Sequence, residues 1–198
     1  MAVVAITAAG AAIDYAAERG HEDTRPEQST PAVVIPTAAI KRETTAPSTP
    51  EPEEERPRIY DSIPLEAELQ EFTFRRCEEK GLDYEMVLAI MERESRFDPT
   101  AISATEDYGI MQINQCNHDW LKEELGITDF MDAKQSITAG TEILGRLAAK
   151  YDDPQKILMA YNMGETGAGR LWKEGTTTSA YSRDIMARRA AILEGGAQ

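Results

Sequence analysis

The stretch that most constrains this protein is Ala89-Ile90-Met91-Glu92-Arg93-Glu94-Ser95-Arg96-Phe97-Asp98-Pro99. Its first part has helical periodicity, and Glu94 falls on the same stripe as the apolar residues Val87, Ile90 and Met91. A carboxyl group held against apolar side chains resists ionisation, so we expect the pKa of Glu94 to rise toward neutrality. Such a group can protonate a leaving oxygen. The stretch therefore predicts acid catalysis of the kind that cleaves a glycosidic bond.

Glu94 also lies close to a helix end, because Pro99 disfavours helical geometry at Asp98. Residues at the junction of a rigid element and a loop are well placed to form the wall of a cleft. The simpler alternative is that Glu94 is an ordinary ion-paired residue, with Arg93 or Arg96 as its partner. Glu94 taken alone favours the ion pair, so a catalytic role needs support from other residues of the chain.

From about residue 63 onward the chain has the pattern of helices separated by Gly and Pro. We expect helices over 65–80, stopped at Gly81, over 84–95, capped by Asp83, after Asn117, through 137–151, from Asp153-Pro154 toward Tyr161, and near 167–173 and 180–193. The only candidate for a sheet is a small hairpin around 108–113. The sequence therefore predicts a mainly α fold.

The N-terminal part differs in composition from the rest. Residues 1–20 begin with an apolar stretch that could be an export signal or anchor remnant, or an Ala-rich helix, and both interpretations stay open. Seven of the ten prolines lie between Pro26 and Pro57, so residues 21–60 are expected to be a disordered linker. This linker could be a tether that reaches outward from a membrane or a solvated extension without function. Residues 61–198 are then the catalytic domain.

The charge and the sparse metal-binding residues narrow the function classes. With 35 acidic against 21 basic residues, the net charge of −14 argues against nucleic acid as a partner. His21 and His118 lie far apart, so neither a metal site nor any other cofactor is expected. Cys77 and Cys116 could form one disulfide in an exported protein, or Cys77 could be a small buried hydrophobe.

Three polar segments after Glu94 carry groups suited to sugars. They are Ser103, Gly109-Ile110-Met111-Gln112-Ile113-Asn114 and Ala160-Tyr161-Asn162-Met163-Gly164. Hydroxyl, amide and phenol groups supply the donors and acceptors that carbohydrate hydroxyls and acetamido groups require. Each residue alone has a structural explanation, as a turn, a core aromatic or a helix cap.

Together these segments resemble the lytic transglycosylases of the soluble-lytic-transglycosylase (SLT) type, in the lysozyme-like superfamily. The matching elements, in order, are Glu94-Ser95, Phe97-Asp98-Pro99-Thr100-Ala101-Ile102-Ser103, Gly109-Ile110-Met111-Gln112, Ala160-Tyr161-Asn162-Met163-Gly164 and the late Tyr181. The resemblance covers about residues 65–190. It implies a lysozyme-like helical domain, like that of goose-type lysozymes, and non-hydrolytic cleavage of peptidoglycan between N-acetylmuramic acid and N-acetylglucosamine.

The resemblance also implies roles for individual residues. Glu94 would be the catalytic acid and base, Ser103 and Gln112 would contact the sugar, and Met111 would pack beneath it. Tyr161 and Asn162 would line the cleft and orient Glu94, while Tyr181 would close the cleft. The expected setting is extracytoplasmic, with peptidoglycan strands as the partner, a monomeric protein, and membrane tethering through the N-terminus as an option.

Two departures from the family pattern keep alternatives open. Glu106-Asp107 replaces a pair of small residues that the family often has before Tyr108, and Asn114 stands where goose-type lysozymes commonly carry an aspartate. Asp98, Glu106 or Asp107 could still hold a water molecule for hydrolysis. The alternatives are a hydrolytic muramidase and an inactive wall-binding module of a secretion, conjugation or phage apparatus.

Overall fold

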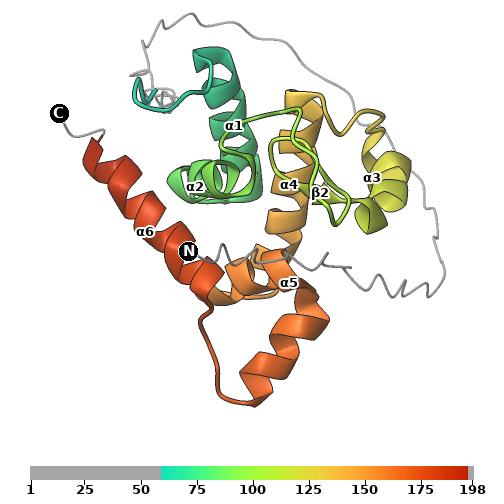
Figure 1. The fold of residues 1–198 in the computed structure, drawn as a ribbon, viewed down its shortest axis with the longest axis vertical. Coiled ribbons are helices and arrows are strands. Elements are labelled where there is room, and N and C mark those ends of the chain that lie inside the picture. The colour runs from blue at the N-terminus through green and yellow to red at the C-terminus, as the bar shows by residue number, and fades with distance from the viewer. Residues whose placement is uncertain (1–58, 196–198) are drawn as a thin grey trace, which may run out of the picture. The chain divides into compact units, whose positions relative to one another are not determined.

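The computed structural model describes residues 59–195, which form a helical domain with one small hairpin (Figure 1). Its elements are α1 (Ala67–Lys80), α2 (Tyr84–Ser95), β1 (Asp107–Tyr108), β2 (Ile113–Asn114), the 3-10 helix η1 (Gln115–Asn117), α3 (His118–Leu125), α4 (Ala133–Ala148), α5 (Pro154–Lys173) and α6 (Ala180–Gly195). The predicted mainly α fold class is confirmed.

Helix α2 is central to the domain, and its boundaries follow from local chemistry. The Asp83 side chain accepts a hydrogen bond from the Met86 backbone N–H at 2.8 Å, as an N-cap aspartate does. The run 87–91 is fully buried, and α2 packs against α1 on one side and α6 on another. At its C-terminus, Arg96 adopts a left-handed conformation and returns its N–H to the Glu92 carbonyl. Helix α2 therefore carries Glu94 on a rigid, buried support.

The hairpin is held close to α4 because two glycines leave room for it. A Cβ atom on Gly140 would lie 2.3 Å from the sulfur of Met111, and one on Gly109 would lie 2.0 Å from the Phe130 carbonyl oxygen. Neither distance is sterically allowed, so larger residues would push the hairpin away from the helices. The strands pair antiparallel, with Asp107 opposite Asn114 and Tyr108 opposite Ile113. The expected small hairpin is therefore present.

Several predicted helix boundaries need correction. The first helix begins at Ala67 instead of residue 65, and α4 ends at Ala148, which leaves Tyr151 outside it. The segment near 167–173 is not a separate helix, because α5 continues to Lys173 through a kink. The kink lies at Gly164, whose φ of 75° and ψ of 157° are readily reached only by glycine. Glycine thus bends this helix without ending it.

Predictions for the cysteines and for the N-terminal part have different outcomes. Cys77 is buried with 1% exposure and forms no disulfide with Cys116, so it is the small core residue of the second alternative. The predicted segment 1–20 and almost all of the linker 21–60 lie outside the described residues. Within residues 59–195, no helix is long and apolar enough to cross a membrane.

Candidate active site

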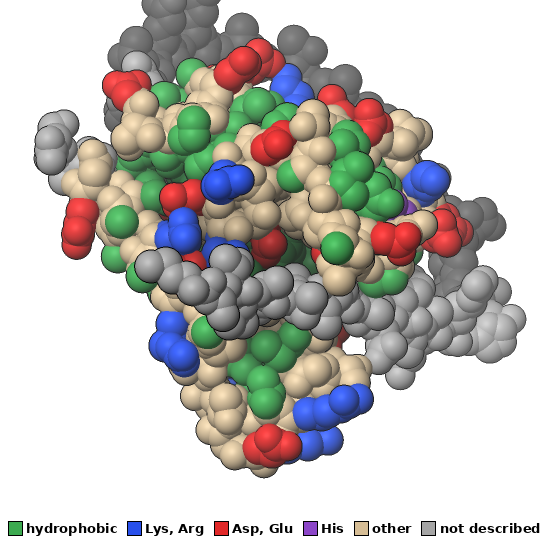
Figure 2. Space-filling model, in the orientation of Figure 1, with side chains coloured by type: hydrophobic (Ala, Val, Ile, Leu, Met, Phe, Trp, Pro, Cys, Tyr) green, Lys and Arg blue, Asp and Glu red, His purple; other side chains and the backbone are tan. Residues whose placement is uncertain are grey.

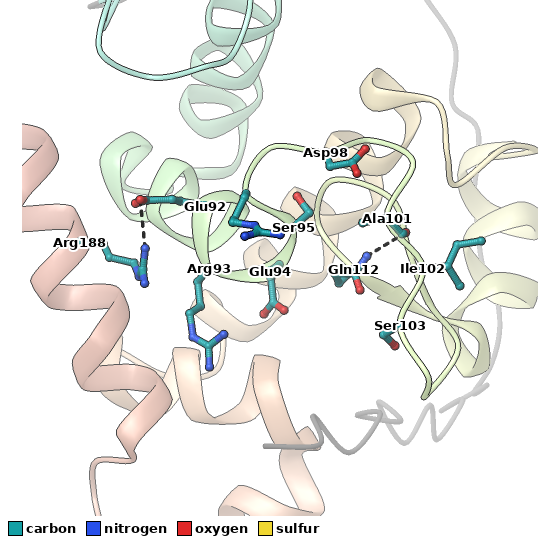
Figure 3. A pocket seen from close by; sticks show the side chains of 11 residues that line it. Glu92, Arg93, Glu94, Ser95, Asp98, Ala101, Ile102, Ser103, Gln112 and Arg188 are labelled. Atoms are coloured by element: carbon teal, nitrogen blue, oxygen red, sulfur yellow. Dashed lines mark hydrogen bonds and ion pairs between the residues drawn. The ribbon is translucent and has the colours of Figure 1, made fainter. Parts of the chain in front are cut away.

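A cavity of about 570 Å³ lies where the C-terminal end of α2 meets the loop that follows it (Figure 3). It is lined by Glu92, Arg93, Glu94, Ser95, Arg96, Asp98, Ala101, Ile102, Ser103, Gln112 and Arg188. Helix α2, the loop and α6 each contribute to this lining. The cavity is large enough for a sugar-sized ligand and presents both charged and polar groups to it.

Glu94 has the raised pKa that the sequence predicted. Burial raises the pKa of its carboxyl group to about 7, because the charged form loses its hydration. A hydrogen bond from the Tyr181 hydroxyl and the charge of Arg93 lower this pKa, while the charge of Asp107 raises it. The predicted rise toward neutrality is confirmed. At neutral pH the group can therefore both donate and accept a proton.

The position of Glu94 is fixed by a contact with α6, not by an ion pair. The Tyr181 hydroxyl donates to Glu94 Oε1 at 2.5 Å, across 87 residues of chain. Arg93 pairs instead with Asp184 of α6 at 3.0 Å. No arginine of the described residues lies within ion-pair distance of Glu94, so the ion-paired alternative is not what the structure shows.

Helix α6 is tied to α2 by several ion pairs that place Tyr181. Arg188 reaches Glu92 at 3.1 Å, and Arg189 reaches Asp83 at 2.5 Å. Acidic and basic side chains accordingly lie next to one another on the face shown in Figure 2. Exposed pairs of this kind each contribute less than about 1 kcal/mol. The buried residues of α6, which include Tyr181 and Ile185, pack against the core, and the ion pairs only set the orientation of the helix.

Ser95 joins helix α2 to the hairpin, a role that the motifs alone did not indicate. Its buried hydroxyl lies 2.8 Å from the Ile110 carbonyl oxygen and 3.2 Å from that of Met91. The first contact bridges α2 and the Gly109–Gln112 turn. The signal available in the sequence was a small hydroxyl residue directly after Glu94, on the side of the helix that faces the core.

Gln112 faces the cavity with a free acceptor. Its Nε2 donates to the backbone oxygens of Ala101 at 3.0 Å and Gly109 at 2.9 Å, so both amide hydrogens are engaged. Its Oε1 has no hydrogen-bond partner among the described residues. The predicted sugar contact of Gln112 is thus geometrically available, as an acceptor for a hydroxyl or amide N–H.

Ser103 lines the same cavity, but its hydroxyl is already in use. The Ser103 Oγ donates to Asp107 Oδ2 at 2.6 Å and accepts from the backbone N–H groups of Thr105 and Asp107, each at 3.1 Å. A hydroxyl has one donor and two acceptor sites, and these bonds occupy them. Ser103 therefore shapes the wall in this structure, and a direct bond to a sugar would have to displace one of them.

The remaining predicted residues lie behind or beside the cavity, not in its lining. Met111 is fully buried, so the predicted packing of its side chain against sugar is replaced by packing against Gly140. Tyr161 donates to the Met111 carbonyl oxygen at 2.9 Å, and burial raises its pKa well above the usual value. Asn162 is half-buried on α5 and makes no side-chain hydrogen bond with the described residues.

The cavity also contains residues that the family pattern did not single out. Arg188 comes from the late helix, and Ile102 is 60% exposed on the rim. Arg188 belongs to no family motif and Ile102 fills a variable position within one, so the motifs did not mark either of them as a lining residue. Within residues 59–195, no three His, Cys, Asp or Glu side chains lie close enough together to hold a metal ion.

Comparison with known proteins gives the class to which this site belongs. Residues 72–185 match the family described as the Transglycosylase SLT domain, so the chain belongs to that family. This confirms the resemblance drawn from the motifs.

Two curated relatives are each named membrane-bound lytic murein transglycosylase F. The protein from Desulfosudis oleivorans is 35% identical over 114 residues, which cover 54% of this chain and 24% of the relative. The protein from Alcanivorax borkumensis is 34% identical over 118 residues, which cover 57% of this chain and 24% of the relative. The chain therefore spans about a quarter of the length of these relatives.

Solved structures show the same fold. An inactive mutant of lytic transglycosylase Slt from Pseudomonas aeruginosa superposes with a TM-score of 0.56 at 16% identity, covering 67% of this chain and 24% of that one. The 70 kDa soluble lytic transglycosylase from Escherichia coli gives 0.56 at 19% identity, covering 67% and 25%. At these identities the likeness concerns the fold alone.

Proposed function

We propose that this protein is a peptidoglycan lytic transglycosylase, which cleaves the β-1,4 bond between N-acetylmuramic acid and N-acetylglucosamine without water. The observation that carries the proposal is Glu94, a carboxyl group with a pKa of about 7 in a cavity of sugar size. The names of the curated relatives, which act on murein, support the same substrate class.

The reaction requires one proton to be given and one to be taken, and Glu94 can do both. Protonated Glu94 donates to the glycosidic oxygen, the C1–O bond breaks, and positive charge develops on the muramic acid ring. The resulting carboxylate then accepts the proton of the C6 hydroxyl of that ring, whose oxygen forms a new bond to C1. The products are a 1,6-anhydro end and a free 4-hydroxyl, and Glu94 is protonated again.

The groups around Glu94 support these steps in different ways. Tyr181 holds the carboxyl group in place through its 2.5 Å hydrogen bond, and Gln112 offers Oε1 to the substrate. Tyr161 fixes the turn that carries Gln112, because it binds the carbonyl of the preceding residue, Met111. Asn162 lies on α5 outside the cavity lining, and its role in orienting Glu94 stays a prediction. Positioning is thereby shared among several residues.

Product analysis tests the proposal directly. The protein and its Glu94→Gln variant are incubated with purified peptidoglycan, and the released muropeptides are analysed by mass spectrometry and borohydride reduction. We expect products that are one water lighter than hydrolysis gives and that resist reduction, from the unaltered protein only. Reducible ends that depend on Glu94 would identify a muramidase instead, and no release would indicate a wall-binding module.

The same proposal sets the location and partners of the protein. Peptidoglycan lies outside the cytoplasmic membrane, so the domain would act extracytoplasmically as a monomer on glycan strands. The curated relatives are named membrane-bound, which favours tethering outside residues 59–195. Deletion of residues 1–58 should leave activity on purified walls intact if that part serves delivery only.

A further inference from the structure

The acidic pair Glu106-Asp107, which departs from the family pattern, separates into two very different environments. Glu106 is exposed, with a positive φ of 61°. Asp107 begins β1 and is only 6% exposed. A buried carboxylate is unfavourable unless hydrogen-bond donors surround it. Asp107 therefore needs hydrogen-bond donors around its carboxylate to be stable in this position.

Three side chains donate hydrogen bonds to Asp107. Its Oδ2 accepts from Ser103 Oγ at 2.6 Å and from Thr105 Oγ1 at 2.5 Å, and its Oδ1 accepts from Asn114 Nδ2 at 2.8 Å. Asn114 is also its partner across the hairpin. Both carboxylate oxygens are thus fixed, and the side chain has a single defined orientation.

Asp107 lies one hydrogen bond behind the cavity wall. Ser103, which binds it, lines the same cavity as Glu94. The charged and titratable groups that act on Glu94 are Tyr181 of α6, Arg93 of α2 and Asp107 of β1, while Glu94 and Asp107 both act on Tyr161 of α5. Asp98 also lines the cavity, but it is exposed and accepts hydrogen bonds from Thr100.

We propose that Asp107 is a positioning residue of this site, which holds Ser103 in the wall and places a fixed negative charge directly behind that wall. The inference rests on the glycosidase-type reaction proposed above. A negative charge at this place stabilises the positive charge that develops on the ring as the bond breaks. It also disfavours early ionisation of Glu94, which must start the reaction protonated.

The test compares Asp107→Asn with Glu106→Gln, which removes an equal charge from the exposed neighbour. For Asp107→Asn, we expect kcat to fall by about 10-fold or more, with KM little changed. The alkaline limb of its pH profile should move to lower pH, because Glu94 loses a negative neighbour and ionises more readily. Glu106→Gln should keep the kcat and the alkaline limb of the unaltered protein.

Further variants separate charge from structure. Ser103→Ala keeps the charge of Asp107 and should lower kcat without moving the alkaline limb. If Asp107→Asn does not fold, Asp107→Ser gives the same readout, since the Ser103 and Thr105 hydroxyls lie 2.9 Å apart and can pair with each other.

The outcomes are distinguishable. A folded Asp107→Asn variant with a lower melting temperature but the kcat and alkaline limb of the unaltered protein would overturn the inference, because the role would then be structural only. A parallel Glu94→Gln sample reports on the proposed function itself. If the unaltered protein cleaved no peptidoglycan, that function would fail as well.

Discussion

The helical frame of this domain, represented by α2, and the cavity wall, residues 96–112, differ in backbone conformation. In the frame, residues 87–91 of α2 are fully buried, and the helix begins with a standard aspartate cap. In the wall, residues 96–112 contain all four non-glycine residues with positive φ in the described part of the chain: Arg96, Phe97, Glu106 and Gln112. The frame is locally relaxed, and the wall is locally strained.

The difference shows how the site is assembled. A non-glycine residue with positive φ costs on the order of 1 kcal/mol and persists only where the surroundings enforce it. Here Ser95, Gln112 and Asp107 bind the wall through hydrogen bonds to Ile110, Ala101 and Ser103. The helical frame determines where Glu94 lies, and the hydrogen-bonded wall determines which groups line the cavity around it.

Glu94→Gln should produce the largest effect, because Glu94 lies where the frame meets the wall. Loss of proton transfer should lower kcat by roughly 10²–10⁴-fold, as measured by release of soluble muropeptides. The melting temperature should not fall, since glutamine can still accept the Tyr181 hydrogen bond without a buried charge. Near-normal turnover in a folded variant would remove Glu94 from the mechanism.

The pH dependence of the unaltered protein should follow from the same residue. The pKa of Glu94 is raised to about 7, so the protonated form is present below this pH and is lost above it. The kcat/KM should therefore fall by about tenfold per pH unit above the pKa. Because folding raises this pKa from 4.5 to about 7, the free energy of unfolding should also fall as pH rises between these two values and level off above about 7. A flat profile from pH 6 to 9 would contradict the assignment.

Ser95→Ala tests the bond between frame and wall. The buried Ile110 carbonyl would lose its partner, so the free energy of unfolding should fall by about 1–3 kcal/mol, and activity should fall with it. Thr73→Val is the matched control, because the buried Thr73 hydroxyl binds only Leu69, inside α1. Urea unfolding and the cleavage assay together should show loss of activity for Ser95→Ala alone.

Glycine substitutions should have the smallest effects, with opposite signs in the two regions. Glu106→Gly relieves a positive φ and should raise the free energy of unfolding by about 0.5–1 kcal/mol. Glu71→Gly, at an exposed position within α1, should lower it by about 1 kcal/mol. Equal signs in urea unfolding would show that the wall is not strained at Glu106.

Much of the fold could be predicted because its signals are local. Asp83, Gly81 and Asp153-Pro154 mark helix ends through their own side chains and dihedral angles, and the structure has the corresponding boundaries. The kink at Gly164 could not be predicted as a continuation of α5, because a glycine signals a break equally well. Packing decides between a kink and an end.

The site was predicted only in part. The apolar stripe of its own helix predicted a raised pKa for Glu94, and the family motifs were needed to favour this over an ion pair. The sugar contact of Ser103 stays a prediction, because its hydroxyl lines the cavity but already binds Asp107, whereas Met111 is fully buried against Gly140. A sequence motif does not show whether a polar group is already hydrogen-bonded within the protein.

The sequence by itself therefore determined the helices, the family and the acid, because caps, periodicity and motif spacing act over a few residues. Only the tertiary structure decided which side chains position Glu94 and surround it. The Tyr181 hydroxyl reaches Glu94 across 87 residues, and Ser95 reaches Ile110 across 15. Asp107 becomes buried only when the hairpin closes on Asn114. Such contacts depend on packing between elements, which no local pattern encodes.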